Sequence, residues 1–414
     1  MDKELLYTIL LSLIYGPSSF SMYNSINLHK GAENAYMALK EGTSEIKKPL
    51  TANQKNNLNK LDISDAEKIA EKCIKENIIP LLISDIRYPQ RLREIYNPPS
   101  LLYCKGDISE LADSPCIAMV GTRNPSQYSL KLASALSKGL ASCGFGIVSG
   151  FAVGIDIISH ISAVTAGGKT YAVIGCGINY NYPKENICFR DHITENGAII
   201  SEYPPDYPPS SFSFPPRNRI LSGMSLGTVV IEAALKSGSL ITANHANDQN
   251  RDLFAVTPCN VFDLRYGGNI SLIRDGAIPV MGIKDILYEY YPEYKDKLTA
   301  KAAEIYSSGF ITGNVYKSSA DQPVSEDTNN TAASSEDISR TVTTETVPDD
   351  ETDFSELPEK QRLIAEIIKK AEHPVLADEI AEEAGLEISE TLSLLTDMEI
   401  DGIVTGGAGN TYYM

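Results

Sequence analysis

The 414-residue sequence predicts an α/β protein with an extended Rossmann-like, doubly wound sheet, preceded by a small helical domain and followed by a winged-helix domain. Three observations lead to this fold class. Short apolar runs alternate with helical patterns from residue 116 to about residue 290, which is typical of a parallel sheet covered on both faces. Residues 1–75 show helical periodicity alone, and residues 355–414 combine it with a terminal hairpin pattern.

The composition is ordinary for a soluble protein, with 43% hydrophobic and 22% charged residues. The first apolar run, residues 5–15, is too short to span a bilayer and follows no basic segment. We therefore expect a cytoplasmic protein without membrane contact. The seven cysteines form no C-x-x-C pair and lie at no metal-ligand spacing with histidine, so we expect reduced core thiols and no metal site.

Residues 1–75 should form a small helical domain of the SAM or helix-hairpin kind. Apolar residues spaced for one helix face run from Leu5 to Ile14, and Gly16-Pro17 ends this helix. Helical patterns return at Ala35–Leu39 and Asp65–Ile74. A module of this kind can bind nucleic acid, but no basic run accompanies the Gly-Pro turn. A docking or structural role is therefore the preferred interpretation.

Residues 76–300 should form the sheet domain. Its first part contains extended segments bordered by prolines, which favours edge strands. Helical patterns at Leu130–Leu140 and Gly154–Val164 then separate apolar runs at Cys116–Val120, Gly146–Ser149, Thr170–Gly175, Ala198–Glu202, Thr228–Glu232 and Leu253–Thr257. A doubly wound sheet binds its ligands beyond the carboxyl ends of its strands, so the site is expected there.

The net charge of −18 is concentrated at the C-terminal end of the chain. Residues 315–355 carry −8 and residues 356–414 carry −9, which leaves residues 1–314 close to neutral. Residues 301–354 lose hydrophobic periodicity and predict a disordered acidic linker. The expected third helix of the winged-helix domain (355–414), Ser389–Ile400, has three acidic residues and neither Lys nor Arg, which disfavours phosphate binding. We expect a protein contact there, or a regulatory flap over a basic site.

Glycine- and serine-rich turns that follow the predicted strands indicate an anion site. Glycine lets backbone amides at a helix start approach a phosphate. One such turn is weak evidence because many strand-to-helix turns use glycine, but three at successive strands and a fourth further on favour a phosphate-rich ligand. The candidate residues are Gly121, Ser149, Gly150, Gly175, Gly177, Ser237, Gly238, Ser239 and Thr242.

Cationic and amide side chains lie beside these turns in the sequence. The candidates are Arg123, Lys184, Asn186, Arg217, Asn218 and Arg219. A guanidinium can hold a phosphate, or it can pair with a buried carboxylate such as Glu202 or Glu232. We assign the ligand role to Arg217 first and regard Arg219 as the structural partner.

The sequence indicates a binding groove and no reaction centre. Asp156 and His160 lie four residues apart on one helix face, but a carboxylate stabilised by the helix start and a packed histidine explain both. The turns lack the G-x-G-x-x-G spacing and no G-K-[ST] follows them, so NAD and ATP are not expected and no cofactor is predicted. The aromatic residues available for base stacking, or alternatively for core packing, are Tyr180, Tyr182, Phe212 and Phe214.

The order of these motifs closely resembles the DNA processing protein A (DprA, or Smf) family over about residues 76–290. The matching segments are Val120–Arg123, Ser149–Asp156 with His160, Tyr182–Asn186, Ser201–Pro204, Phe214–Gly223, Glu232–Ala243 and Gly267–Ala277. The flanking helical and winged-helix domains match by architecture only. Pro258-Cys259 departs from the family's Pro-Gly, and we assign no contact to it.

The resemblance implies a non-enzymatic protein that binds single-stranded DNA, dimerises and loads the RecA recombinase during uptake or recombination of DNA. It implies DNA contacts from Arg123, Lys184, Arg217 and Asn218, with the glycines and serines named above shaping the cradle. The alternative is an enzyme, a nucleotide phosphoribohydrolase of the lysine-decarboxylase-like group. The PGG-x-GT-x-x-E signature of those enzymes is absent from this chain.

Overall fold

The computed structural model describes residues 2–44 and 49–308 and, near the C-terminus, residues 358–371, 375–386, 390–392, 394, 395, 398, 403–406 and 411–413. Residues 1–311 form one compact unit and residues 312–414 form a second. Most of the expected acidic linker, from residue 309 on, lies outside the described residues.

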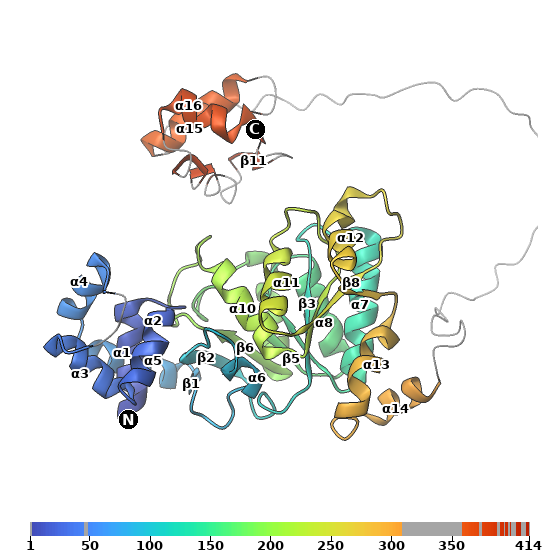
Figure 1. The fold of residues 1–414 in the computed structure, drawn as a ribbon, viewed down its shortest axis with the longest axis horizontal. Coiled ribbons are helices and arrows are strands. Elements are labelled where there is room, and N and C mark those ends of the chain that lie inside the picture. Colours follow the sequence, from blue (N-terminus) through green and yellow to red (C-terminus); the bar gives the residue numbers. More distant parts are fainter. Residues whose placement is uncertain are drawn as a thin grey trace, which may run out of the picture. The chain divides into compact units, whose positions relative to one another are not determined.

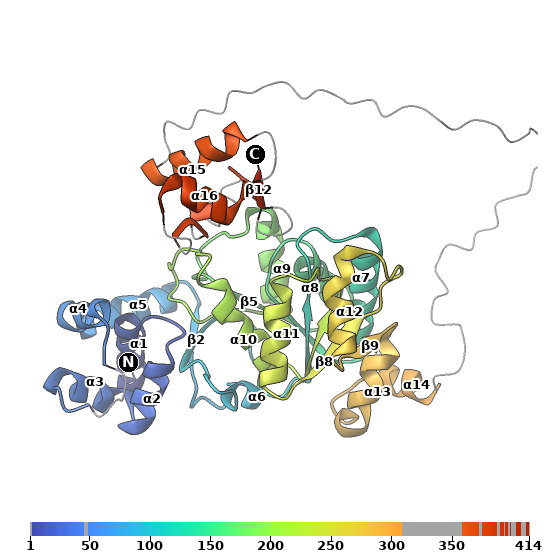
Figure 2. The same cartoon turned by 45° about the horizontal axis from the view of Figure 1, so that its top comes forward.

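The N-terminal helices gather beside the β1 end of the main sheet (Figure 1; Figure 2). They are α1 (Lys3–Tyr15), α2 (Phe20–Leu28), α3 (Ala32–Glu41), α4 (Ala52–Lys60) and α5 (Ile63–Lys75). Asp2 and Asp62 cap α1 and α5, because each carboxylate accepts a hydrogen bond from a free backbone amide of the first turn. Leu10 of α1 and Cys73 of α5 share one apolar core with residues of the sheet. The helical residues are therefore packed on the sheet within the first compact unit.

The main sheet has the strand order β1-β2-β6-β5-β4-β3-β7-β8-β9. Strands β3 to β9 run parallel to one another. At one edge β2 pairs antiparallel with β6 and β1 pairs antiparallel with β2, as the proline-bordered segments predicted. The chain runs outward from β3 to β6 and then crosses back to place β7 on the other side of β3. The strands are β1 (Ile79–Leu82), β2 (Leu101–Gly106), β3 (Cys116–Val120), β4 (Gly146–Ser149), β5 (Thr170–Ile174), β6 (Gly197–Ser201), β7 (Gly227–Val230), β8 (Asp252–Val256) and β9 (Ile278–Val280).

Helices cover both faces of this sheet, which explains why its strands are apolar on both sides. Along β3, Ile117 and Met119 belong to one core and Cys116 and Val120 to the other, because successive side chains point to opposite faces. One face carries α6 (Gln90–Arg93), α10 (Phe214–Met224), α11 (Ser239–Asp248) and α12 (Gly267–Arg274). The other carries α7 (Gln127–Ser142), α8 (Ile155–Thr165), α9 (Arg190–Glu195) and α13 (Ile283–Tyr294), together with α1 and α5. This confirms the doubly wound, Rossmann-like fold.

The segment after residue 300 corrects one prediction. Residues expected to begin the disordered linker instead form a further helix, α14 (Ala300–Ser307). Ala302 is fully buried, and the Tyr306 ring stacks on Tyr291 of α13 with ring centroids 4.3 Å apart. The sequence showed no apolar periodicity here, so it underestimated the extent of the sheet unit. This short helix is held by one buried alanine and an aromatic contact, which leave no repeating apolar pattern in the sequence.

The second unit has the elements of a winged helix. It contains α15 (Glu359–Lys370), β10 (Val375–Leu376), α16 (Ala377–Ala384), β11 (Thr405–Gly406) and β12 (Thr411–Tyr413). The strands form an antiparallel sheet in the order β10-β12-β11, and Ile364, Ile380 and Met398 pack in one core. Gly385 ends α16 in a left-handed conformation (φ 65°), as its position after the apolar stripe predicted. The predicted third helix lies only partly within the described residues. No helix described in either unit is long and apolar enough to cross a membrane.

Candidate nucleic-acid interface

A narrow pocket opens where β3, β4 and β5 end, which is the edge at which the sequence placed the ligand. Its volume is about 60 Å³, room for about four water molecules, so it accepts one small group and excludes a whole dinucleotide. The turns after these strands and the start of α10 line it. The lining residues are Arg123, Gly150, Ala152, Val153, Ile174, Gly175, Cys176, Tyr182, Pro183, Phe214 and Arg217.

Arg217 forms one wall of this pocket from the second turn of α10. The helix begins with Phe214-Pro215-Pro216, which suits a first turn because proline there loses no helical hydrogen bond. The Arg217 side chain is buried, and its Nη1 donates to the carbonyl oxygens of Gly150 (2.8 Å) and Val173. Its Nε has no partner among the described residues. Arg217 therefore ties α10 to the ends of β4 and β5 and still presents its charge to the pocket.

Asp156 shapes the turn after β4 opposite this guanidinium. Its Oδ2 accepts hydrogen bonds from the backbone amides of Gly150 (3.1 Å) and Ala152 (3.3 Å). Burial raises the pKa of Asp156, and the positive charge of Arg217 opposes that shift. Arg217 forms no ion pair with a described carboxylate. Burial lowers the pKa of Arg217, and the nearby charge of Asp156 opposes that shift. Asp156 thus offsets part of the charge of Arg217 on this wall of the pocket.

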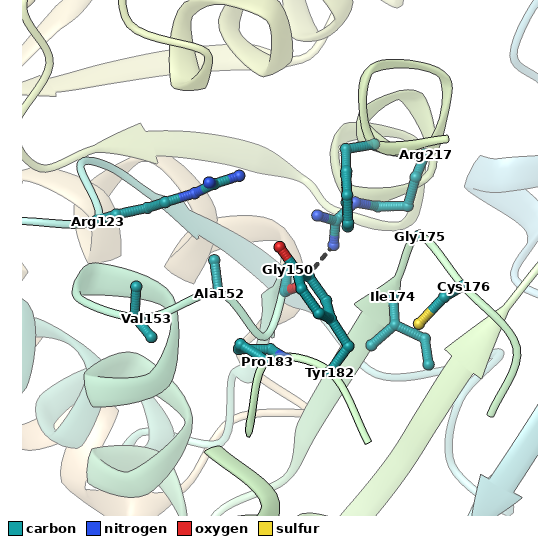
Figure 3. Close-up of a pocket in the computed structure, with 11 residues that line it drawn as sticks. Arg123, Gly150, Ala152, Val153, Ile174, Gly175, Cys176, Tyr182, Pro183 and Arg217 are labelled. Atoms are coloured by element: carbon teal, nitrogen blue, oxygen red, sulfur yellow. Dashed lines mark hydrogen bonds between the residues drawn. The ribbon is translucent and has the colours of Figure 1, made fainter. Parts of the chain in front are cut away.

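Arg123 supplies a second guanidinium at the mouth of the pocket. It follows β3, is exposed, and has no hydrogen bond or ion pair to any described residue. Figure 3 shows the Arg123 and Arg217 guanidiniums pointing toward each other across the space above Gly150. Arg123 is also close enough to lower the pKa of Arg217. Two cations that repel each other across a cavity are an arrangement that an anion between them would stabilise.

The segment after β5 closes the pocket from the remaining side. Tyr182 and Pro183, joined by a cis peptide bond, line it, and the Tyr182 ring lies 5.6 Å from the Phe214 ring between centroids. Lys184 comes next and is exposed at the start of a short 3₁₀ helix, Lys184–Phe189. Asn186 is buried and donates from Nδ2 to the Phe151 carbonyl (2.8 Å), so its amide stabilises the turn after β4. This placement gives Asn186 a structural role, and a ligand contact from it stays a prediction.

The glycines of the strand-end turns are explained by protein packing. A Cβ built on Gly150 would lie 2.6 Å from Arg217 Nη1, one on Gly121 would lie 2.7 Å from Ile155 Cγ1, and one on Gly175 would lie 2.7 Å from Phe214 Cδ1. A Cβ on Gly177 would clash with the carbonyls of Pro204 and Pro205. Ser149 is buried as well, and its hydroxyl donates to the Met119 carbonyl (2.6 Å). These positions shape the pocket by permitting close approach of protein atoms.

Two groups of predicted contacts lie outside this pocket. The turn before α11 contains Ser237, Gly238 and Ser239, and the two serine hydroxyls bond each other at 2.7 Å. Gly238 is exposed with no atom within 4 Å of a built Cβ, whereas Thr242 is buried. This turn follows β7, next to β3 in the sheet, but none of its residues lines the pocket.

Arg219 has the structural role that the sequence favoured for it. Its guanidinium donates to both carboxylate oxygens of Glu202, at 2.7 and 2.9 Å, and both side chains are buried. This pairing argues against a DNA contact from Arg219. Asn218, between the two arginines on α10, is half-buried. Glu232, the other proposed partner, instead accepts hydrogen bonds from Ser126 and Tyr266.

Asp156 and His160 are both buried and engaged in hydrogen bonds within the protein. His160 is fully buried, and its Nδ1 lies 2.6 Å from Thr170 Oγ1. Burial lowers its pKa to about 3, so the imidazole is neutral near pH 7. No cluster of His, Cys, Asp and Glu suited to a metal ion occurs in the part of the chain that the structure describes.

Several lining residues were not predicted from the sequence. Ala152, Val153, Ile174 and Cys176 line the pocket through their position next to the strand ends, and nothing in their own chemistry distinguishes them. Tyr182 and Phe214 were named only as stacking candidates; both now lie against the pocket, whereas Phe212 is 73% exposed and outside it. The available signal was the strand-end position itself.

Comparisons with known proteins agree in both units. The family described as DNA recombination-mediator protein A matches residues 80–291, and the family described as DprA winged helix domain matches residues 347–410. The DNA processing protein DprA of Bacillus subtilis is 44% identical over 217 residues, covering 52% of this chain and 72% of that protein. Its counterpart in Streptococcus pneumoniae is 42% identical over 208 residues, covering 50% and 73%.

Solved structures of the same kind of protein are also similar. The X-ray structure of DNA processing protein A from Streptococcus pneumoniae superposes with a TM-score of 0.59 and 32% identity, covering 70% of this chain and 98% of that one. A structure of DNA processing protein A from Helicobacter pylori, described for its single-stranded DNA binding mode, gives a TM-score of 0.47 and 32% identity, covering 52% and 97%.

Proposed function

Because this chain belongs to the DNA processing protein A (DprA/Smf) family, we propose that it is a DNA-processing protein whose pocket at the β3–β5 ends binds the backbone of single-stranded DNA. The observation that carries the proposal is the pair of guanidiniums from Arg123 and Arg217, which share one cavity. Neither forms an ion pair with a carboxylate of the described residues, although Asp156 lies near Arg217. A phosphate between them would relieve their mutual repulsion and form charge-assisted hydrogen bonds. The cavity of about 60 Å³ has room for one small group such as a phosphate.

Lys184 is the third cation of the proposed binding surface. It is exposed beside Pro183, which lines the pocket, so it stands at the rim and can meet the neighbouring phosphate. Asn218 and the turn Ser237–Ser239 would extend the contact along the same edge of the sheet. With about one phosphate charge neutralised by each of the three cations, the logarithm of affinity should fall with the logarithm of salt with a slope of roughly −2.

The test is a salt titration of binding to fluorescently labelled oligonucleotides, followed by anisotropy. Arg123→Ala should weaken binding to every single-stranded sequence alike and reduce the salt slope by about 0.7, because one phosphate contact is lost. Lys138→Ala is the matched control, since Lys138 is an exposed lysine of α7 that does not line the pocket. A loss confined to certain sequences, or equal effects of the two substitutions, would reject backbone capture.

We further propose that the protein dimerises, loads the RecA recombinase onto the bound strand and works in the cytoplasm without enzymatic activity, as the family membership implies. The burial of Asp156 and His160 in structural contacts supports the absence of a reaction centre near the pocket. The nucleotide phosphoribohydrolase alternative is not favoured, because the matching families and relatives are DNA-processing proteins. Incubation with AMP should release no adenine.

A further inference from the structure

A stack of aromatic side chains lies at the same edge of the sheet as the pocket, where the helical residues meet the sheet. Tyr96 is 80% exposed and stacks on Phe20, the first residue of α2, with ring centroids 4.5 Å apart and planes 25° apart. Phe20 in turn stacks with Tyr23, at 6.5 Å and 28°. An exposed aromatic ring of this kind offers a flat apolar face on which another ring can stack.

The backbone beneath Tyr96 is held in place from several directions. The Arg219 Nε donates to the Asn97 carbonyl (2.9 Å), and the Asn97 Nδ2 donates to the Ser18 carbonyl (3.3 Å). The Ser18 hydroxyl donates to Glu202, which is the carboxylate that pairs with Arg219. The Tyr96 ring is therefore fixed before any ligand arrives, which lowers the entropy cost of stacking on it.

The sheet topology connects this stack to the pocket. Tyr96 precedes β2, and β2 starts at the carboxyl end of β6 because the two strands are antiparallel, with Tyr103 opposite Ser201. Two strand positions separate β2 from β5, whose end forms the pocket, a lateral offset on the order of 10 Å. Each nucleotide of a duplex strand advances about 3.4 Å along the helix axis, and an extended single strand advances further, so a few nucleotides suffice to bridge that offset.

A cleft of about 300 Å³ continues the stack at this edge. It lies between α1 and α2 on one side and the end of β1 and the start of β2 on the other, and Tyr23, Asn27, Lys30 and Ser100 are among its lining residues. Lys30 is exposed, and no hydrogen bond or ion pair to another described residue involves its ammonium group. Glu4 also lines the cleft, and its carboxylate accepts hydrogen bonds from the Ala32 amide. The cleft thus offers an aromatic ring and an unpaired ammonium group, two features that single-stranded nucleic acids bind.

We propose that Tyr96, stacked on Phe20, is a base-stacking subsite for the single strand whose backbone occupies the pocket, and that the cleft with Lys30 takes the next nucleotide. This inference rests on the proposed function and adds to it a role for the helical residues in DNA binding. The occupant is an unpaired nucleobase. The flat Tyr96 ring, 80% exposed, matches the face of a base, and the proposed pocket already anchors the backbone of the same strand nearby.

The absence of tryptophan from the sequence makes a direct test possible, since Tyr96→Trp introduces a single tryptophan into the full-length protein. Oligo-dT of about ten nucleotides should quench its fluorescence, while an abasic strand of equal length should bind without quenching. Ile74→Trp is the control, because Ile74 is 69% exposed on α5, next to the opposite edge of the sheet, and should not be quenched. Tyr96→Ala should weaken binding of the ten-nucleotide strand by roughly 5- to 150-fold, the range for one stacked base.

The anisotropy of labelled DNA, measured in parallel, separates the two proposals. Binding without quenching at position 96, together with unchanged affinity of Tyr96→Ala, would overturn the stacking subsite and leave the pocket intact; the stack would then be a joint between α2 and the sheet, or a protein contact. No binding at all would refute the proposed function itself. Thermal unfolding of Tyr96→Ala distinguishes a lost DNA contact from a loosened joint.

Discussion

The glycine turns allow a prediction that separates two explanations of the same residues. If the glycines admit a phosphate, adding a methyl group at any of them should reduce DNA affinity and leave stability unchanged. If they admit neighbouring protein atoms, the effect should follow the local packing. Gly150→Ala and Gly238→Ala form a matched pair, because both glycines lie in predicted phosphate turns and their surroundings differ.

The magnitudes follow from the space around each glycine. A Cβ at Gly150 would lie 2.6 Å from both Arg217 Nη1 and Asp156 Oδ2, so one of these buried groups must move. Overpacking of this kind costs about 1–3 kcal/mol in the free energy of unfolding. At about 2–4 °C per kcal/mol, the melting temperature should fall by roughly 2 to 12 °C. A Cβ at Gly238 meets no atom within 4 Å, so Gly238→Ala should leave the melting temperature nearly unchanged.

Thermal unfolding and DNA anisotropy of the two variants provide the assay. Gly150→Ala should lose both stability and affinity, because the displaced Arg217 belongs to the pocket wall. Gly238→Ala should stay stable, and any loss of affinity it shows reports a direct DNA contact at the turn before α11. A Gly150→Ala variant with wild-type stability and reduced affinity would refute the packing explanation.

Three further predictions concern charge. Glu202→Gln should cost about 3–5 kcal/mol in urea unfolding because it leaves Arg219 buried without its carboxylate, while the salt slope of DNA binding stays unchanged; a change in that slope would return Arg219 to the DNA surface. Burial holds the pKa of His160 at about 3, against about 6.5 in the unfolded chain, so stability should fall as the pH drops below about 6.5. His160→Gln should remove up to about 1.4 kcal/mol per pH unit of that slope, and an identical slope in denaturant titrations would contradict the assignment. Truncation after Ile311 removes a net charge of −17 and should tighten DNA binding at low salt but not at high salt, where exposed charges are screened; equal affinity at low salt would end the idea of an acidic flap.

The sequence was sufficient for the architecture of the chain. Apolar runs on both strand faces, as in Cys116–Val120, require a sheet buried between two helical layers, and a parallel sheet directs its ligands to the carboxyl ends of the strands. The family motifs located the turns and cations that meet at this edge. These inferences succeed because periodicity and turn chemistry are local properties. The start of the linker was missed because α14 is stabilised mainly by tertiary contacts, including that of Tyr306 with Tyr291.

The roles of individual residues depended on tertiary structure. Arg217 and Arg219 are two residues apart with the same side chain, yet one lines the pocket and the other pairs with Glu202. Successive residues of a helix point in different directions, so only the position of α10 over β3, β4 and β5 determines which guanidinium meets which neighbour. The same holds for Asn186, whose amide is occupied by Phe151, and for Tyr96, whose place beside Phe20 no local pattern indicates. Residue type and spacing identify the groups available for binding, and the fold decides which of them already have a partner.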